Sequence, residues 1–205
     1  GAGIEVDRGS VVRLIVGLLV GGVIYAASAV TISLAAGPLS IVAAPAPVSA
    51  WVVLTVVASF LALSAMEELG FRGYPLRALT GAIGMPLAHA ITAIAFGLSH
   101  LLYGWSWSAV LVGVIPSGLL FGAAAVAGRG LAFPIGVHAA LNLAAWTIGM
   151  KDTPGPWVVA LTVGTEQRIG QAGPWVGLGV TLAATLILFR VRDHRLVKRL
   201  LVVPM

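Results

Sequence analysis

The chain has 205 residues, of which 59% are hydrophobic and only 9% are charged. Soluble domains carry about 25% charged residues, so this composition excludes a globular protein surrounded by water and favours one whose surface faces lipid. The formal net charge of +5 does not indicate nucleic-acid binding, because the basic residues cluster at the ends of apolar runs, as they do in membrane proteins. The chain has no cysteine, so it can form neither disulfides nor thiolate metal sites.

The apolar runs, taken in chain order, predict membrane-spanning helices, each of which takes about 20 residues. Helices are expected because backbone polar groups must be satisfied inside lipid, and the runs are too long and continuous for barrel strands. The expected runs cover about 11–36, 48–79, 86–103, 108–127, 131–149 and 174–189. The sequence therefore predicts an all-α, polytopic transmembrane helix bundle with about six spans, forming a single transmembrane domain over residues 1–205.

The connections between these runs contain turn-forming residues. A Pro-rich break at 38–47 follows the first run, and a polar loop at 151–171 precedes the sixth. Pro116 is expected to kink the fourth run, because proline removes a helical hydrogen bond.

Three pairs of glycines are spaced four residues apart: Gly17/Gly21, Gly118/Gly122 and Gly173/Gly177. This spacing occurs on dimer faces, but close packing of helices within one chain is the favoured interpretation.

The basic residues predict the orientation of the helices. Six spans place both termini on one side, and ten of the twelve basic residues then share that side. These ten are Arg8, Arg13, Arg72, Arg77, Arg129, Arg190, Arg192, Arg195, Lys198 and Arg199. Since cytoplasmic loops carry the excess of lysine and arginine, both termini are expected in the cytoplasm, and the Ala-, Gly- and Val-rich composition points to a bacterial cytoplasmic membrane.

Three ionisable residues interrupt the second run: Glu67, Glu68 and Arg72. If one helix covers 48–79, Glu67 lies roughly 18 Å from its cytoplasmic end, near the bilayer midplane, where a charge costs about 2.5–3.5 kcal/mol. Glu68 and Arg72 are four residues apart and can pair on one face, whereas Glu67 points elsewhere and has no cation near it along the helix. A solvated cluster at the membrane interface is the simpler alternative.

Two other runs carry polar pairs. Phe96 and His100 lie four residues apart in the third run, and His138 and Asn142 lie four apart in the fifth. A lone histidine in an apolar helix is usually a satisfied core residue, which is the interpretation for His89. His100 and His138 are interpreted as functional, because a third helix supplies a carboxylate at a comparable depth once the helices tilt.

A carboxylate, two imidazoles and a carboxamide suit the hydrolysis of an amide bond by water. A desolvated carboxylate can take a proton from water near neutral pH. One imidazole can share that water or protonate the leaving amine. A second imidazole and an amide NH₂ can donate hydrogen bonds to the developing oxyanion, and these bonds are strongest in a dry site.

The three segments occur in a fixed order: Glu67-Glu68-Leu69-Gly70-Phe71-Arg72-Gly73, then Phe96-x-x-x-His100, then His138-x-x-x-Asn142. This ordered set resembles the CPBP family, the CAAX proteases and bacteriocin-processing enzymes also called Abi proteins. Each motif alone is weak, whereas the three in order on separate helices are specific. The resemblance covers about 49–149, the expected catalytic core, with 11–36 and 174–189 as additional spans.

The resemblance implies an intramembrane endopeptidase of the CAAX-processing type and a role for each motif residue. Glu67 would activate water as the general base, assisted by His100. His138 and Asn142 would form the oxyanion hole. Glu68 and Arg72 would hold the site together rather than react.

Zinc is an alternative, because the family is often labelled as metalloproteases. Catalytic zinc takes three protein ligands and a water, which Glu67, His100 and His138 can supply, although no helix carries a His-Glu-x-x-His motif. A metal-free mechanism that depends on the glutamate uses the same residues and is favoured, so no cofactor is expected.

Other functions remain open on the sequence alone. A rhomboid-type serine protease is disfavoured, because Ile115 stands where the Gly-x-Ser-Gly motif of that family needs glycine before Ser117. A transporter, a small-molecule-binding subunit, or a catalytically silent scaffold or immunity protein would also suit six spans with a few buried ionisable groups. The expected partners are the lipid bilayer and a peptide or protein substrate, prenylated or not, and no nucleic acid. The oligomeric state is not predicted.

Overall fold

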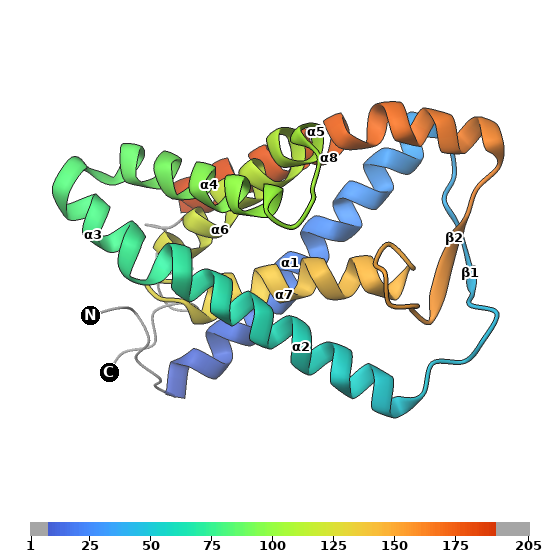
Figure 1. Ribbon diagram of the computed structural model, residues 1–205, viewed down its shortest axis with the longest axis horizontal. Helices are drawn as coiled ribbons and strands as arrows, with labels where there is room; N and C mark the ends of the chain where they lie inside the picture. Colours follow the sequence, from blue (N-terminus) through green and yellow to red (C-terminus); the bar gives the residue numbers. More distant parts are fainter. Residues whose placement is uncertain (1–7, 192–205) are drawn as a thin grey trace.

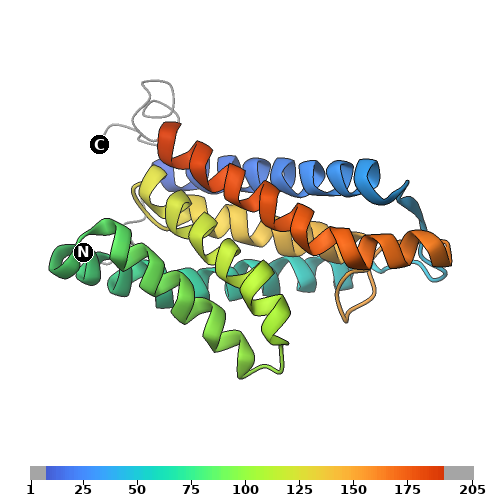
Figure 2. The same cartoon turned by 90° about the horizontal axis from the view of Figure 1, so that it is seen from above.

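A computed structural model describes residues 8–191, except for the side chain of Arg8. Within this range the chain forms helical rods that lie side by side (Figures 1 and 2). In chain order the elements are α1 (Arg8–Ala36), β1 (Ser40–Ala43), α2 (Ala50–Glu68), the π-helical turn η1 (Leu69–Gly73), α3 (Tyr74–Ile83), α4 (Met85–Leu101), α5 (Trp107–Ala109), the π-helical turn η2 (Val110–Val114), α6 (Ile115–Ala127), α7 (Ala132–Thr147), β2 (Trp157–Ala160) and α8 (Val163–Val191).

These elements confirm the predicted all-α bundle. Among the described residues, four helical stretches are long and apolar enough to cross a membrane: Gly9–Ala36, Ala50–Ile83, Trp107–Ala127 and Val163–Val191. Helix α4 is apolar but has 17 residues, and α7 has 16. The predicted runs therefore correspond to helices in the right order, and the number of full spans, about six, is approximate.

Two parts of the prediction need correction. Helix α8 begins at Val163, so residues 163–171 of the expected loop are helical, and Pro174 lies inside the helix. The two breaks also contain short strands, which pair antiparallel with Ser40 opposite Ala160 and Ala43 opposite Trp157. Extended, β-branched residues in both breaks favour strands, but only the approach of the two loops in space gives each strand its partner.

Helix α1 packs along α7, and glycines permit the close approach. A Cβ on Gly21 would lie 2.5 Å from the carbonyl oxygen of Val137, and a Cβ on Gly17 would collide with the carbonyl oxygen of Phe133. Gly118 faces the backbone of Ala93 on α4 in the same way. These contacts support the favoured interpretation, close packing within one chain, for the first two glycine pairs.

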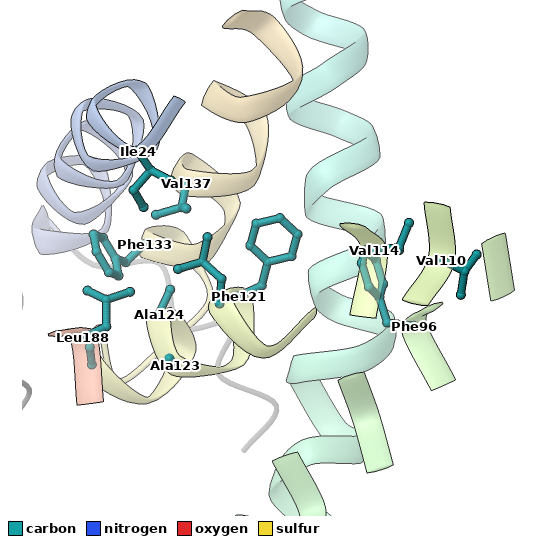
Figure 3. Close-up of a cluster of buried hydrophobic side chains, with 12 residues drawn as sticks. Ile24, Phe96, Val110, Val114, Phe121, Ala123, Ala124, Phe133, Val137 and Leu188 are labelled. Carbon is teal, nitrogen blue, oxygen red and sulfur yellow. The ribbon is translucent and has the colours of Figure 1, made fainter. Parts of the chain in front are cut away.

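The core lies around α6 and α7 (Figure 3). Phe133 and Val137 of α7 pack with Ile24 of α1, and Phe121 of α6 lies beside them. On the outside, large apolar side chains such as Val23, Leu34 and Trp51 are mostly exposed. An exterior of this kind suits lipid rather than water as the surrounding medium.

Candidate active site

The predicted site residues meet around one cavity of about 630 Å³. Glu67 from α2, His100 from α4, and His138 and Asn142 from α7 all line it, together with Phe96. The structure thus brings the four predicted catalytic residues together, although their depths differ when each is counted along its own helix.

Glu67 is the next-to-last residue of α2, two residues before the π-helical turn η1 begins. Its side chain is 15% exposed, whereas that of its neighbour Glu68 is fully buried. A π-helical turn shifts the side chains that follow it relative to a regular helix, and such turns recur at functional sites. Here the turn carries Arg72 into the protein interior.

Glu68 and Arg72 form the ion pair that their spacing predicts. Arg72 Nη1 lies 3.3 Å from Glu68 Oε1, and Nη2 donates to the backbone oxygen of Gly118 at 2.9 Å. The guanidinium also lies over the ring of Phe96, 4.4 Å from its centroid. Both side chains are fully buried. Each therefore stabilises the charge of the other, which would otherwise be unpaired in an apolar interior.

His138 lies between the two glutamates. Its Nδ1 is 3.0 Å from Glu68 Oε1, and its Nε2 is 3.4 Å from Glu67 Oε2. The ring stacks on Phe121, with the centroids 4.2 Å apart and the planes at 14°. The expectation for Glu67 concerned only its own helix, whereas in the structure a different helix supplies an imidazole that is positively charged whenever it is protonated.

The backbone fixes the ring of His100. Its Nδ1 lies 2.9 Å from the carbonyl oxygen of Phe96, and a carbonyl only accepts hydrogen bonds, so Nδ1 carries the proton. In the neutral ring Nε2 then carries no proton and acts as an acceptor. A group that is to accept a proton or a hydrogen bond in the cavity needs such a nitrogen. The rings of Phe96 and Trp105 pack edge-on against the imidazole.

Sequence reasoning missed Lys151 as a site residue. Its Nζ donates to Asn142 Oδ1 at 2.8 Å, and the side chain lines the cavity. Burial lowers the pKa of the Lys151 ammonium, while the charges of Asp152 and Glu67 oppose that shift. The only sequence signal was a basic residue shortly after the fifth apolar run.

A turn at the end of α7 brings Lys151 back to the cavity. Gly149 adopts a left-handed conformation with φ of 76°, as glycine commonly does just after a helix, and Met150 N donates to the oxygen of Ala145. The indole of Trp146 donates to the oxygen of Pro154 at 3.2 Å and fastens the following loop.

Other polar residues near the site have structural partners. His89 Nε2 lies 2.8 Å from the backbone oxygen of Leu119, consistent with its interpretation as a satisfied core residue. Ser117 lines the cavity, but its hydroxyl donates to the backbone oxygen of Gly113 at 2.9 Å.

The three residues considered as zinc ligands do not form a metal-binding group. Within residues 8–191, no three or more His, Asp or Glu side chains are arranged to hold a metal ion. In this arrangement both ring nitrogens of His138 face glutamate oxygens. The three side chains, as they are placed here, therefore do not fit a zinc ion.

Comparison with known proteins gives one family. The model of the Rce1-like family, described as type II CAAX prenyl endopeptidase Rce1-like, matches residues 48–144. The matched segment contains Glu67, Glu68, Arg72, Phe96, His100, His138 and Asn142. No curated protein and no solved structure matches the chain.

Proposed function

Since residues 48–144 belong to the Rce1-like family of type II CAAX prenyl endopeptidases, we propose that this intramembrane endopeptidase cleaves its substrate with a water molecule activated by Glu67 and His100. The meeting of Glu67, His100, His138 and Asn142 around one cavity supports this mechanism. Phe96 and Phe121 line the same cavity, and apolar walls of this kind strengthen the electrostatic interactions between the polar groups.

In the proposed reaction, the Glu67 carboxylate takes a proton from water, and Nε2 of His100 accepts a hydrogen bond from the same water. The oxygen of this water attacks the carbonyl carbon of the scissile peptide bond. The carbon–nitrogen bond then breaks, and the proton held by Glu67 moves to the leaving amine. General acid–base assistance of this type contributes about 10²–10⁴-fold to the rate.

His138 and Asn142 are proposed to stabilise the oxyanion that forms on the carbonyl oxygen. His138 Nδ1 faces an oxygen of Glu68 at 3.0 Å, so this nitrogen donates. When the ring is doubly protonated, Nε2–H becomes a second donor, and the Glu68 carboxylate stabilises that charged ring. The amide NH₂ of Asn142 supplies the other donor.

The first test replaces the base. Glu67→Gln keeps the shape of the side chain but removes its ability to take a proton, so we expect peptide cleavage to fall by at least about 10²-fold. Purified wild type and variant, in detergent, are given a peptide library that includes farnesylated C-terminal peptides, and the products are identified by mass spectrometry. Glu166→Gln is the matched control, because Glu166 is exposed at the start of α8, and it is expected to cleave at the wild-type rate.

Two outcomes would contradict the proposal. Equal cleavage by wild type and Glu67→Gln would remove Glu67 from the reaction. No cleavage by a folded wild type would favour a transporter or a catalytically silent scaffold. A chelator added to the wild-type reaction tests the metal independently, and we expect unchanged cleavage, because the proposed steps use only side chains of the chain and water.

The orientation in the membrane is also proposed. The end of the bundle that we assign to the cytoplasm carries Arg13, Arg77, Arg129 and Arg190, whereas the other end carries Lys151 and Arg168. Four more basic residues support this orientation but lie outside the described residues: Arg192, Arg195, Lys198 and Arg199. Both termini would then be cytoplasmic, and the loop residues of the cavity, Tyr103, Trp105 and Lys151, would lie towards the opposite face.

The substrate is proposed to be a peptide or protein segment within or beside the bilayer. The division into a catalytic core at about 49–149 with additional spans also stays a prediction. However, Tyr25 and Ser28 of α1 and Thr181 of α8 line the cavity, although they lie outside the segment that matches the family. We therefore expect the additional helices to contribute to the choice of substrate.

A further inference from the structure

Lys151 contacts one of the proposed oxyanion donors from outside the segment that matches the family. The matched segment stops at residue 144, whereas Lys151 Nζ donates to Asn142 Oδ1 at 2.8 Å. An ammonium group has three donors and no acceptor, while a carboxamide has one acceptor oxygen and a donor NH₂. The contact therefore determines which end of the Asn142 amide faces the lysine.

We propose that Lys151 is a positioning residue that holds the Asn142 carboxamide with its NH₂ group directed into the cavity, where it donates to the oxyanion. This inference rests on the proposed function, which gives Asn142 its role. Without the lysine, the amide can rotate and present its oxygen to the reacting carbonyl. An oxygen in that position repels the developing negative charge instead of stabilising it.

Two contacts and a chain reversal hold Lys151 in place for this role. Its ammonium lies 5.7 Å from the ring centroid of Phe60 on α2, within the range of a cation–π interaction. The reversal at Gly149 and the bond from Trp146 to Pro154 fix the backbone on either side. A donor held in position before the reaction stabilises charge without reorganisation at the moment of reaction.

The test is a double-mutant cycle on Lys151 and Asn142. Lys151→Met keeps the apolar stem but removes the donor, and Asn142→Ala removes the amide. We expect Lys151→Met to lower kcat by about 10- to 100-fold with little change in KM, because an oxyanion donor acts mainly in the transition state. In the Asn142→Ala background the same substitution is expected to change kcat by less than about 2-fold, because residues that act as one unit are not additive.

Two further variants separate positioning from folding. Lys151→Arg retains donors without an acceptor and is expected to keep most of the wild-type kcat. Thr153→Ala is the matched control, because Thr153 is exposed in the same loop and should leave kcat unchanged. Thermal unfolding of each purified variant in detergent shows whether any loss of kcat comes from unfolded protein.

The possible results distinguish the inference from the proposed function. If Asn142→Ala lowers kcat but Lys151→Met costs the same factor in both backgrounds, Lys151 acts independently of Asn142 and the inference is wrong, while the proposed function stands. An unchanged kcat in Lys151→Met also overturns the inference. If Asn142→Ala itself leaves kcat unchanged, the oxyanion role of Asn142 fails, and the positioning role fails with it.

Discussion

At the scale of single residues, the pair of Glu68 and Arg72 shows how a membrane-embedded site keeps charges in its interior. Both side chains are fully buried, and Arg72 also donates to the backbone oxygen of Gly118. Replacing a buried ion pair as a whole is often tolerated, whereas removing one partner leaves an uncompensated charge. Substitutions of Glu68 and of Arg72 should therefore have non-additive effects on the free energy of unfolding.

We expect Arg72→Met to lower the free energy of unfolding by about 3–5 kcal/mol, because Glu68 is left without its buried partner. The double variant Glu68→Gln/Arg72→Met should be more stable than Arg72→Met alone, since it contains no unpaired charge. Thermal unfolding in detergent measures both. A double variant less stable than Arg72→Met would show that packing, rather than charge compensation, determines the cost.

The position of Lys151 in the chain explains why the helical motifs did not predict it as a site residue. The predicted residues belong to motifs in which two side chains lie four apart on one helix, a spacing that places them on one face. Lys151 lies nine residues after Asn142, beyond the end of α7, and contacts it only because the chain reverses at Gly149. No helical period predicts a contact across such a reversal.

At the scale of elements, the contact between α1 and α7 depends on glycine. A Cβ on Gly21 would lie 2.5 Å from the backbone oxygen of Val137 and 2.7 Å from the Cβ of Ala140. A backbone oxygen within a helix cannot move aside cheaply, so the two helices would have to separate. A Cβ on the next residue, Gly22, would meet no described atom of another helix within 4 Å.

This difference gives a matched pair of substitutions in one helix. Gly21→Ala is expected to destabilise the protein by about 1–3 kcal/mol through overpacking. Gly22→Ala should leave the stability unchanged or raise it by up to about 1 kcal/mol, because alanine is the better helix former. The unfolding temperatures of the two variants in detergent test this, and equal changes would mean that α1 does not pack on α7 at Gly21.

The π-helical turn η1 is the second feature at this scale. The sequence predicts one continuous helix over 48–79, and the chain is helical from Ala50 to Ile83, but the turn at Leu69–Gly73 interrupts the regular period. Gly70 and Gly73 lie within it, and glycine tolerates irregular backbone. The pairing of Glu68 with Arg72 nevertheless survives, because the side chains still meet at 3.3 Å.

At the scale of the whole molecule, the proposed orientation can be tested directly, because the chain has no cysteine. Single cysteines introduced at exposed positions then report on one site each. Thr153→Cys lies in the loop after α7, and Ala82→Cys lies at the end of α3 near its turn into α4. We expect a membrane-impermeant maleimide to label Thr153→Cys on intact cells and Ala82→Cys only after permeabilisation.

The opposite labelling pattern would reverse the orientation. The loop residues of the cavity would then lie towards the cytoplasm, and substrates would be expected from that side. The cysteine-free parent chain is the control for background labelling. Retained peptide cleavage by each variant would show that labelling reports on the functional fold.

The sequence by itself determined the surrounding medium, the type of secondary structure and the pairs of side chains that share one face of a helix. Low charge content required lipid as the solvent, apolar runs of sufficient length required helices, and a spacing of four placed Glu68 with Arg72, and His138 with Asn142, on shared faces. These are properties of one helix and its medium, so they need no knowledge of neighbouring helices. The all-α bundle followed from them, whereas the resemblance to the CPBP family came from the three motifs in order.

Only the tertiary structure decided how those faces meet. It placed His138 between Glu67 and Glu68, brought Lys151 back onto Asn142, and paired the strands of two distant breaks. Each of these contacts joins separate helices or crosses a chain reversal, and its geometry depends on crossing angles, glycine contacts and turns that no periodic pattern encodes. Four of the residues that gather at the cavity were therefore predictable from the sequence, but the positions of the charges relative to one another were not.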